Sequence, residues 1–240
     1  MNNISNSFQV AGYSALIHFF KENFSIKVSD SQFENFLYKK YGISKRGSLK
    51  ITNTLIILNL IDSKDSFNTI TGSGLSWLTE EENIIKCSAL AGLFYLEVNG
   101  QNQGLHFSNF FGFIQHIHHL SNEQSKAVEK IIAENNWIEY TYTKSPNVLI
   151  MESGRLAMDA PFLTPKLEIC AKAGIIYLSG VDHDNHSISM DHFHDFLTSS
   201  FHLDKEDVRI IINHLIGYDY IDYDDEFVED TNKGRIFATK

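Results

Sequence analysis

The stretch that decides the fold is Ser200–Lys240, which reads SFHLDKEDVRIIINHLIGYDYIDYDDEFVEDTNKGRIFATK. After Asp204, apolar residues recur at helical spacing: Val208, Ile211, Ile212, Leu215 and Ile216. An Asp before such a series is typical of a capped helix. Two short β-rich runs follow, Tyr220–Tyr223 and Phe227–Val228, with acidic residues between them. This pattern predicts a helix that leads into a β-hairpin.

The same pattern occurs three times along the chain. Between the second and third copies, matching residues lie 82 or 83 positions apart until the hairpin and 80 apart after it. The matching segments are Ala91–Leu96 with Ala173–Leu178, Trp137–Tyr140 with Tyr220–Tyr223, and Gly154 with Gly234. The shorter final offset predicts three extra residues in the middle hairpin, around Ser145-Pro146-Asn147. The first copy matches the third at a constant offset of 160, through Gly74 and Gly234. Caps and glycines at steady offsets indicate tandem repeats.

Each copy shows the order helix, short strand, helix, helix, strand, wing, strand. We expect Ser29, Ser108 and Ser189 to cap the second helices, and Ser44, Ser121 and Asp204 the third. This order resembles the winged-helix superfamily over nearly the whole chain. The resemblance implies a mostly helical α+β fold, with three helices and a small β-hairpin wing per domain. The domains predicted are 8–80, 81–160 and 161–240, and the glycines after each hairpin are expected to form a turn.

Bulk composition narrows the class of protein. The N-terminus lacks the basic and then apolar pattern of a signal peptide. No apolar run approaches the roughly 18 residues that span a bilayer. Two cysteines cannot build a disulfide framework. We therefore expect a soluble, cytoplasmic protein without a membrane partner.

Charge is distributed unevenly over the copies. Residues 1–80 carry a net +2, residues 81–160 a net −4 and residues 161–240 a net −8, within a whole-chain charge of −10. DNA readers of the winged-helix superfamily usually insert the third helix in the major groove and set a basic wing against phosphate. By this resemblance, only the first copy is suited to nucleic acid. Its candidate contact residues are Lys39, Lys40, Lys45, Arg46, Lys50, Asn53 and Lys64. The alternative interpretation is that Lys39, Lys40 and Lys45 belong to a solvated turn and bind no nucleic acid.

The third copy is too acidic for a polyanion, because repulsion would oppose counterion release. We expect its acidic edge either to be solvated or to bind a basic partner protein. The candidate partner-binding residues are Asp222, Asp224, Asp225, Glu226, Glu229 and Asp230.

Catalytic motifs are absent from the sequence. Gly72-Ser73-Gly74 is not a nucleophile elbow, and there is no phosphate-binding loop or dinucleotide fingerprint. The histidines, clustered at 116–119 and 183–194, lack the spacing of metal ligands. Cys87 and Cys170 are expected to be buried. We predict no enzyme activity, no cofactor and no metal.

The sequence thus favours a non-catalytic interaction protein, an adaptor or subunit of a nucleic-acid-associated complex. The alternative is a transcriptional or replication regulator that reads DNA through the first copy. A metal protein or enzyme that uses the histidine clusters is the more distant alternative, and the oligomeric state stays open, a homo-oligomer included.

Overall fold

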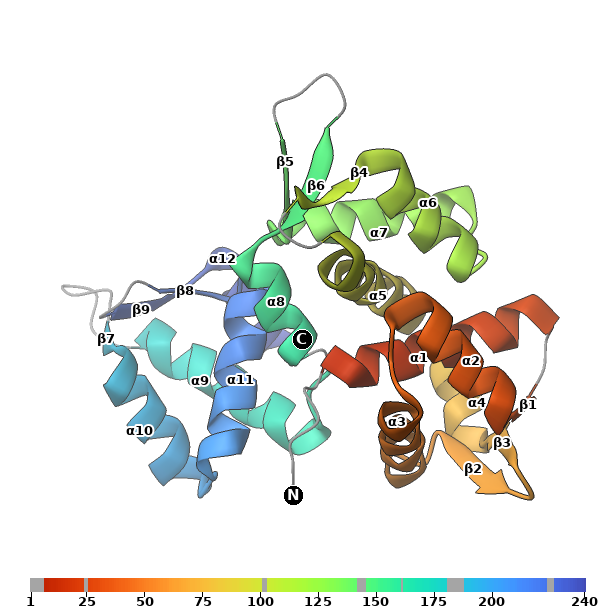
Figure 1. Cartoon of the computed structure of the whole chain (residues 1–240). Coiled ribbons are helices and arrows are strands. Elements are labelled where there is room, and N and C mark those ends of the chain that lie inside the picture. Colours follow the sequence, from red (N-terminus) through yellow and green to blue (C-terminus); the bar gives the residue numbers. More distant parts are fainter. Residues whose placement is uncertain are drawn as a thin grey trace. The chain divides into compact units, whose positions relative to one another are not determined.

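The computed structural model describes residues 7–23, 26–100, 103–141, 146–160, 162–180, 188–223 and 227–240. Over these ranges the chain forms twelve helices and three small antiparallel sheets of three strands each (Figure 1). Helices and sheets alternate in a repeating pattern, and each sheet pairs its first strand with its third. The predicted class, mostly helical α+β with three repeated units, is confirmed.

The repeats share the same order of elements. The first contains α1 (Ser7–Asn23), β1 (Lys27–Ser29), α2 (Asp30–Tyr41), α3 (Lys45–Ile57), β2 (Ile61–Lys64), β3 (Phe67–Ile70) and α4 (Gly72–Thr79). The second contains α5 (Glu81–Gly100), β4 (Leu105–His106), α6 (Phe107–Ile117), α7 (Asn122–Glu134), β5 (Ile138–Tyr140), β6 (Asn147–Ile150) and α8 (Glu152–Asp159). The third contains α9 (Pro165–Gly180), β7 (Ile188–Ser189), α10 (Met190–Phe201), α11 (Lys205–Gly217), β8 (Ile221–Tyr223), β9 (Phe227–Asp230) and α12 (Asn232–Thr239).

Two left-handed turns recur at equivalent places in the backbone. Between the second and third helices, the left-handed residues are Gly42 (φ 65°), His119 (φ 48°) and His202 (φ 51°). After the third helix, they are Asn59 (φ 56°), Asn136 (φ 50°) and Asp219 (φ 58°). Gly, Asn and Asp tolerate this conformation better than other residues do. The turns therefore support the repeat independently of the apolar pattern.

Most of the predicted helix caps are confirmed. The third helices are capped by Ser44, Ser121 and Asp204, whose side chains accept hydrogen bonds from the backbone of the first turn. Ser29 and Ser189 cap α2 and α10 in the same way. The prediction for Ser108 was wrong, because α6 begins at Phe107, two residues earlier than a Ser108 cap implies, and His106 is its cap.

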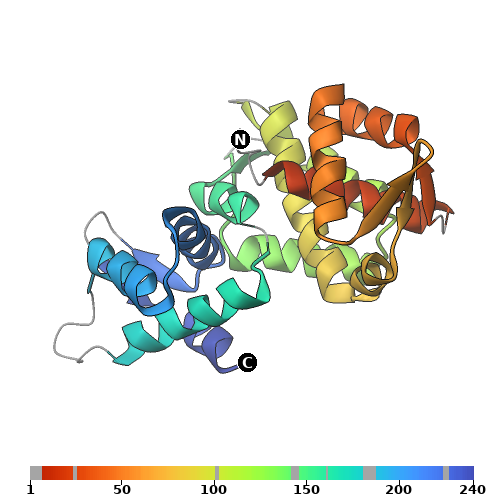
Figure 2. The same ribbon diagram turned by 90° about the horizontal axis from the view of Figure 1, so that it is seen from below.

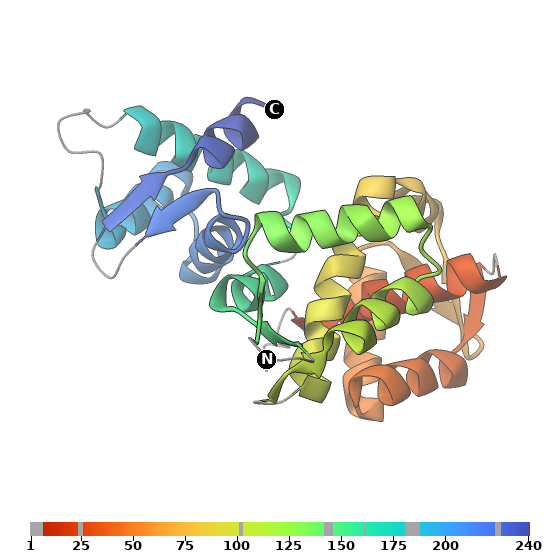
Figure 3. The ribbon, with the colours of Figure 1, turned by 90° about the horizontal axis from the view of Figure 1, so that it is seen from above.

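The hairpins confirm the predicted insertion in the middle copy. Paired residues at the open end are nine positions apart in the first and third hairpins, Ile61 with Ile70 and Ile221 with Asp230. In the middle hairpin, Ile138 pairs with Ile150, twelve positions away. The insertion falls between β5 and β6; Ser145 lies outside the described residues. Figure 2 shows the β2–β3 hairpin in orange, and Figure 3 the β8–β9 hairpin in blue.

The glycines after each hairpin do not form the expected turn. They begin a fourth helix of eight residues: α4, α8 and α12. Thr71 and Thr231 cap α4 and α12, and each accepts a hydrogen bond from the glycine three residues later. A Cβ on Gly74 would strike the carbonyl oxygen of Leu60, and one on Gly234 that of Tyr220. Close contact with the turn that follows the third helix therefore requires glycine here.

The chain divides into two compact units, residues 1–151 and 152–240. In the first, α1 packs on α5, and Phe33 and Phe110 are buried in the core. In the second, α9, α10, α11 and the strands enclose a core around Phe193 and Ile211. Cys87 and Cys170 are free and buried, as predicted.

The helix α8 follows the hairpin of the second repeat but belongs to the second compact unit, where it packs along α11 (Figure 1). A Cβ on Gly217 would come within 2.5 Å of the backbone nitrogen of Ala157. Nearby, the buried His214 donates from Nδ1 to the carbonyl oxygen of Ala160 at 2.8 Å. Close backbone approach thus holds α8 against α11.

Candidate functional site

The basic residues predicted in the first repeat are spread over three elements. Lys39 and Lys40 lie in the last turn of α2, where positive charge also favours the helix C-terminus. Lys64 ends β2. The four residues that share α3 are Lys45, Arg46, Lys50 and Asn53. Of these, Lys45 lies 3.8 Å from the carboxylate of Glu34, but its side chain is 85% exposed, so this ion pair is weak.

The solvent-facing side of α3 is also apolar, which sequence reasoning missed. Leu49 is 60% exposed, Ile56 38% and Ile57 83%. The buried side of α3 consists of Ser48, Ile51 and Leu55, on the opposite face. Three consecutive apolar residues, Ile56-Ile57-Leu58, cannot all lie on the one buried stripe of an amphipathic helix. This run was therefore the sequence feature that could have indicated exposed apolar residues on α3. Together with Arg46, Lys50 and Asn53, these three residues form what we call the α3 face.

The equivalent helices lack this exposed apolar surface. At the positions of Leu49, Asn53, Ile56 and Ile57, α7 carries Lys126, Lys130, Ala133 and Glu134. In α11 the corresponding residues are Arg209, Asn213, Ile216 and Gly217. Gly217 is buried against α8, whereas Ile57 is the most exposed large apolar residue in the described part of the chain. The α3 face is therefore specific to the first repeat.

The acidic edge of the third repeat contains residues with different roles. Asp222 and Glu229 are exposed and pair across β8 and β9, where like charges repel. Asp224, Asp225 and Glu226 lie outside the described residues. Asp230 is engaged within the fold, and its side chain is only 9% exposed.

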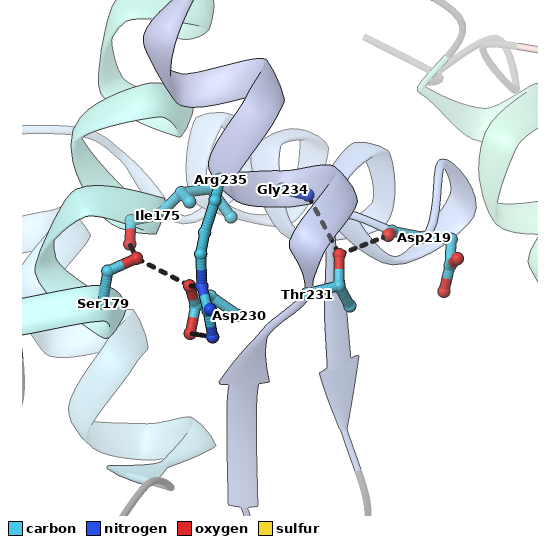
Figure 4. A network of polar contacts seen from close by, with 7 residues as sticks. All are labelled: Ile175, Ser179, Asp219, Asp230, Thr231, Gly234 and Arg235. Atoms are coloured by element: carbon cyan, nitrogen blue, oxygen red, sulfur yellow. Dashed lines mark hydrogen bonds and ion pairs between the residues drawn. The ribbon is translucent and has the colours of Figure 1, made fainter. Parts of the chain in front are cut away.

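Figure 4 shows the contacts of Asp230. Its carboxylate accepts hydrogen bonds from Arg235 Nε at 2.5 Å and from Ser179 Oγ at 2.6 Å. Burial acts to raise the pKa of Asp230, but these hydrogen bonds and the charge of Arg235 outweigh it and lower the pKa. Asp230 therefore joins β9 to α9 and α12.

A pocket of about 740 Å³ lies within the first compact unit, where the first and second repeats meet. From the first repeat, it is lined by His18 and Glu22 of α1 and Lys40 of α2. The second repeat contributes Tyr95, Leu105, Ser108, Asn109, Gly112, Phe113, His116, Ile117 and His119. We call this the joint pocket. It places Lys40 beside histidines that the sequence did not connect with it.

The polar groups of the joint pocket are held by specific contacts. His18 Nδ1 donates to the carbonyl oxygen of Ile117 at 2.8 Å, and its Nε2 lies 3.1 Å from the carboxylate of Glu22. Partial burial lowers the pKa of His18, although both of these contacts act to raise it. Across the described residues, no group of three or more His, Cys, Asp or Glu side chains is arranged to hold a metal ion.

A buried polar network lies close to the pocket and joins the two repeats. His118 is fully buried; its Nε2 lies 2.7 Å from Ser14 Oγ, and its Nδ1 lies 2.8 Å from Ser88 Oγ. Ser14 also lies 2.6 Å from the hydroxyl of Tyr41. Burial lowers the pKa of His118 to about 3, helped by the nearby His18 and Lys21. In the sequence, only the presence of Ser14 and Ser88 within apolar helices could have indicated this network.

Comparison with known proteins gave no match: no family model fits the chain, and no curated protein or solved structure is significantly similar to it. A bilayer-spanning helix is likewise not found among the described elements.

Proposed function

We propose that the chain is a non-catalytic interaction protein of three winged-helix repeats, an adaptor or subunit of a nucleic-acid-associated complex. Its main docking surface is the α3 face, and the partner element is an amphipathic helix with acidic residues. The observation that carries this proposal is the exposure of Leu49, Ile56 and Ile57 beside Arg46 and Lys50. Contiguous exposed apolar residues with a charged rim are typical of protein-binding surfaces.

The pairing of α8 with α11 supports a helix as the partner element. On α11, Gly217 contacts Ala157 of α8, and His214 contacts Ala160, the residue that directly follows α8. The equivalent residues of α3 are Thr54 and Ile57, and Ile57 is 83% exposed. A helix placed there would remove Ile57 from water, which contributes about 1.5–3 kcal/mol. Basic residues beside it select a partner helix that carries carboxylates.

Site-directed photo-crosslinking in the native host tests this proposal. A photoreactive amino acid replaces Ile57, and the matched control carries it at Glu134, the equivalent exposed position on α7. We expect Ile57 to crosslink to one protein, within a helix rich in Asp and Glu, and the Glu134 control not to do so. Equal crosslinking from both positions, or crosslinking of Ile57 to nucleic acid alone, would contradict the proposal.

A second candidate function is regulation through DNA binding by the first repeat. It is favoured by the grouping of Lys45, Arg46, Lys50 and Asn53 on one helix. Its test is a gel shift at low salt with the triple variant Lys45→Glu, Arg46→Glu, Lys50→Glu. If the protein is a regulator, the triple variant loses DNA binding, and binding by the wild type resists competition by unrelated DNA. Contact with the DNA backbone alone would be salt-sensitive but would not depend on the DNA sequence.

The acidic edge offers a further contact for the same adaptor. Asp222 and Glu229 are exposed and adjacent, and a basic partner segment would relieve their repulsion. Neutralising both residues should release such a partner without affecting crosslinking from Ile57.

A further inference from the structure

The glycine at position 112 has no steric reason to be a glycine. It lies in the middle of α6, and a Cβ built there meets no atom within 4 Å. Glycine is among the residues least favourable to a helix interior. By contrast, a Cβ on Gly92 would overlap the side chain of Ile114, and one on Gly174 would lie 3.1 Å from the ring of Phe193.

The other repeats carry side chains at the position of Gly112. The equivalent residues are Asn35 of α2 and Asp195 of α10. Asp195 lines a smaller pocket of about 490 Å³ in the third repeat, together with Asp191 and His192. The same surface is therefore acidic in the third repeat and open in the second. What glycine provides at position 112 is space in the wall of the joint pocket.

An aromatic pair forms the apolar part of this pocket. Tyr95 and Phe113 stack with ring centroids 3.7 Å apart and an interplanar angle of 4°. The corresponding pairs in the other repeats are His18 with Phe36 and Tyr177 with Phe196. Of the three equivalent phenylalanines, only Phe113 is directly preceded by a glycine, so a flat ligand can approach the rings.

The polar groups around these rings favour an anion. Lys40 brings a positive charge from the first repeat, and His116 and His119 bring imidazole donors from the second. The one carboxylate in the lining, Glu22, lies against His18 at 3.1 Å. Ser108 and Asn109 add neutral hydrogen-bonding groups on the same side of α6. Seven of the twelve lining residues are polar, so the pocket suits a ligand that carries a charged group as well as an apolar part.

We propose that the joint pocket binds a small organic anion with a flat apolar part. Its carboxylate or phosphate group lies near Lys40, His116 and His119, and its apolar part lies against Tyr95 and Phe113. Both repeats supply contacts, so the ligand stabilises their joint. This site is independent of the α3 face and does not depend on the docking function proposed above.

Titration of the full chain with phenyl phosphate, followed by NMR or calorimetry, tests this assignment. Inorganic phosphate is the comparison ligand, because it offers the anion without the ring. We expect saturable binding of phenyl phosphate at the pocket residues, with at least about tenfold weaker binding of inorganic phosphate. Equal affinity for both would refute the role of the aromatic pair. No saturable binding of phenyl phosphate at 10 mM (roughly the weak limit for a specific small-molecule site) would overturn the proposal.

Three variants locate the site. Gly112→Leu fills the pocket with a good helix former, and we expect it to weaken phenyl phosphate binding about tenfold or more while raising the melting temperature. Gly112→Ala is the matched control, since it gains the same helix preference but leaves most of the space. Lys40→Gln should weaken binding of both anions. Unchanged binding in Gly112→Leu would place any ligand elsewhere and refute the pocket.

Discussion

The buried imidazole of His118 should make the first compact unit lose stability in mild acid. Burial lowers the pKa of His118 from 6.5 to about 3. In the unfolded chain the side chain takes up a proton below about pH 6.5, but in the folded protein it does so only near pH 3. The contribution of His118 is therefore present above pH 6.5 and is lost as the pH falls from there toward 3.

The size of the loss follows from proton linkage. Each pH unit below the unfolded pKa costs about 1.4 kcal/mol until the folded pKa is reached. From pH 7.5 to pH 5, the His118 contribution should thus fall by about 2 kcal/mol. This is a large part of the total stability of a small domain, which is about 5–15 kcal/mol.

Urea unfolding monitored by tryptophan fluorescence measures this effect. The two tryptophans of the chain, Trp77 and Trp137, both lie in the first compact unit, so their signal reports on that unit. In His118→Gln, we expect a pH-independent loss of about 1–3 kcal/mol, because the contacts to Ser14 and Ser88 are impaired. The difference between pH 7.5 and pH 5 should shrink by about 2 kcal/mol relative to the wild type.

The control is His116→Gln, which alters an exposed imidazole two residues earlier and should keep the wild-type pH dependence. If His118→Gln shows the same loss of stability between pH 7.5 and pH 5 as the wild type, His118 is not a buried neutral imidazole and the reasoning fails.

Three further predictions concern the second compact unit. Gly234→Ala forces a Cβ against a backbone carbonyl and should lower the free energy of unfolding by about 2 kcal/mol or more. In Gly180→Ala the Cβ meets open space, so this control variant should be as stable as the wild type or more stable. Calorimetric melting of the full chain compares the two variants. Asp230→Ala removes the acceptor shared by Ser179 and Arg235. Because Arg235 can bind water and Ser179 also reaches the carbonyl oxygen of Ile175 at 3.0 Å, the loss should be about 1 kcal/mol by the same measurement, and no loss would contradict the structural role of Asp230. A fragment of residues 152–240 should give a cooperative melting transition. A fragment of residues 161–240 lacks α8 and should melt at a lower temperature. Equal melting temperatures of the two fragments would show that α8 does not stabilise this unit.

Much of the repeat architecture could be predicted because its signals are local. A serine or aspartate cap, an Asn or Asp in a left-handed turn and a hairpin register depend on a few neighbouring residues. The offsets of these signals placed the extra residues of the middle hairpin correctly. The fourth helices were missed because each has only eight residues and begins near a glycine, which by itself indicates a turn.

The tertiary features could not be predicted in the same way. That α8 packs on α11 depends on close backbone approach at Gly217, a residue that reads in sequence as a helix end. In the sequence His118 is one of the histidines clustered at 116–119, and its burial between Ser14 and Ser88 depends on helices far away in the chain. On the candidate site, sequence identified the basic residues of α3, but whether Leu49 or Ile57 is exposed depends on what packs against the helix.

One position of the third helix shows how the repeats have diverged within a common fold. It is Ile57 in α3, Glu134 in α7 and Gly217 in α11. Glutamate suits a solvated helix, and glycine allows the backbone of α8 to approach, so both residues match their surroundings. Ile57 is 83% exposed, so this apolar side chain neither suits a solvated helix surface nor packs against another element. Since a helix already covers this position in the third repeat, a partner helix on α3 is the arrangement in which Ile57 would match its surroundings as well as the other two residues match theirs.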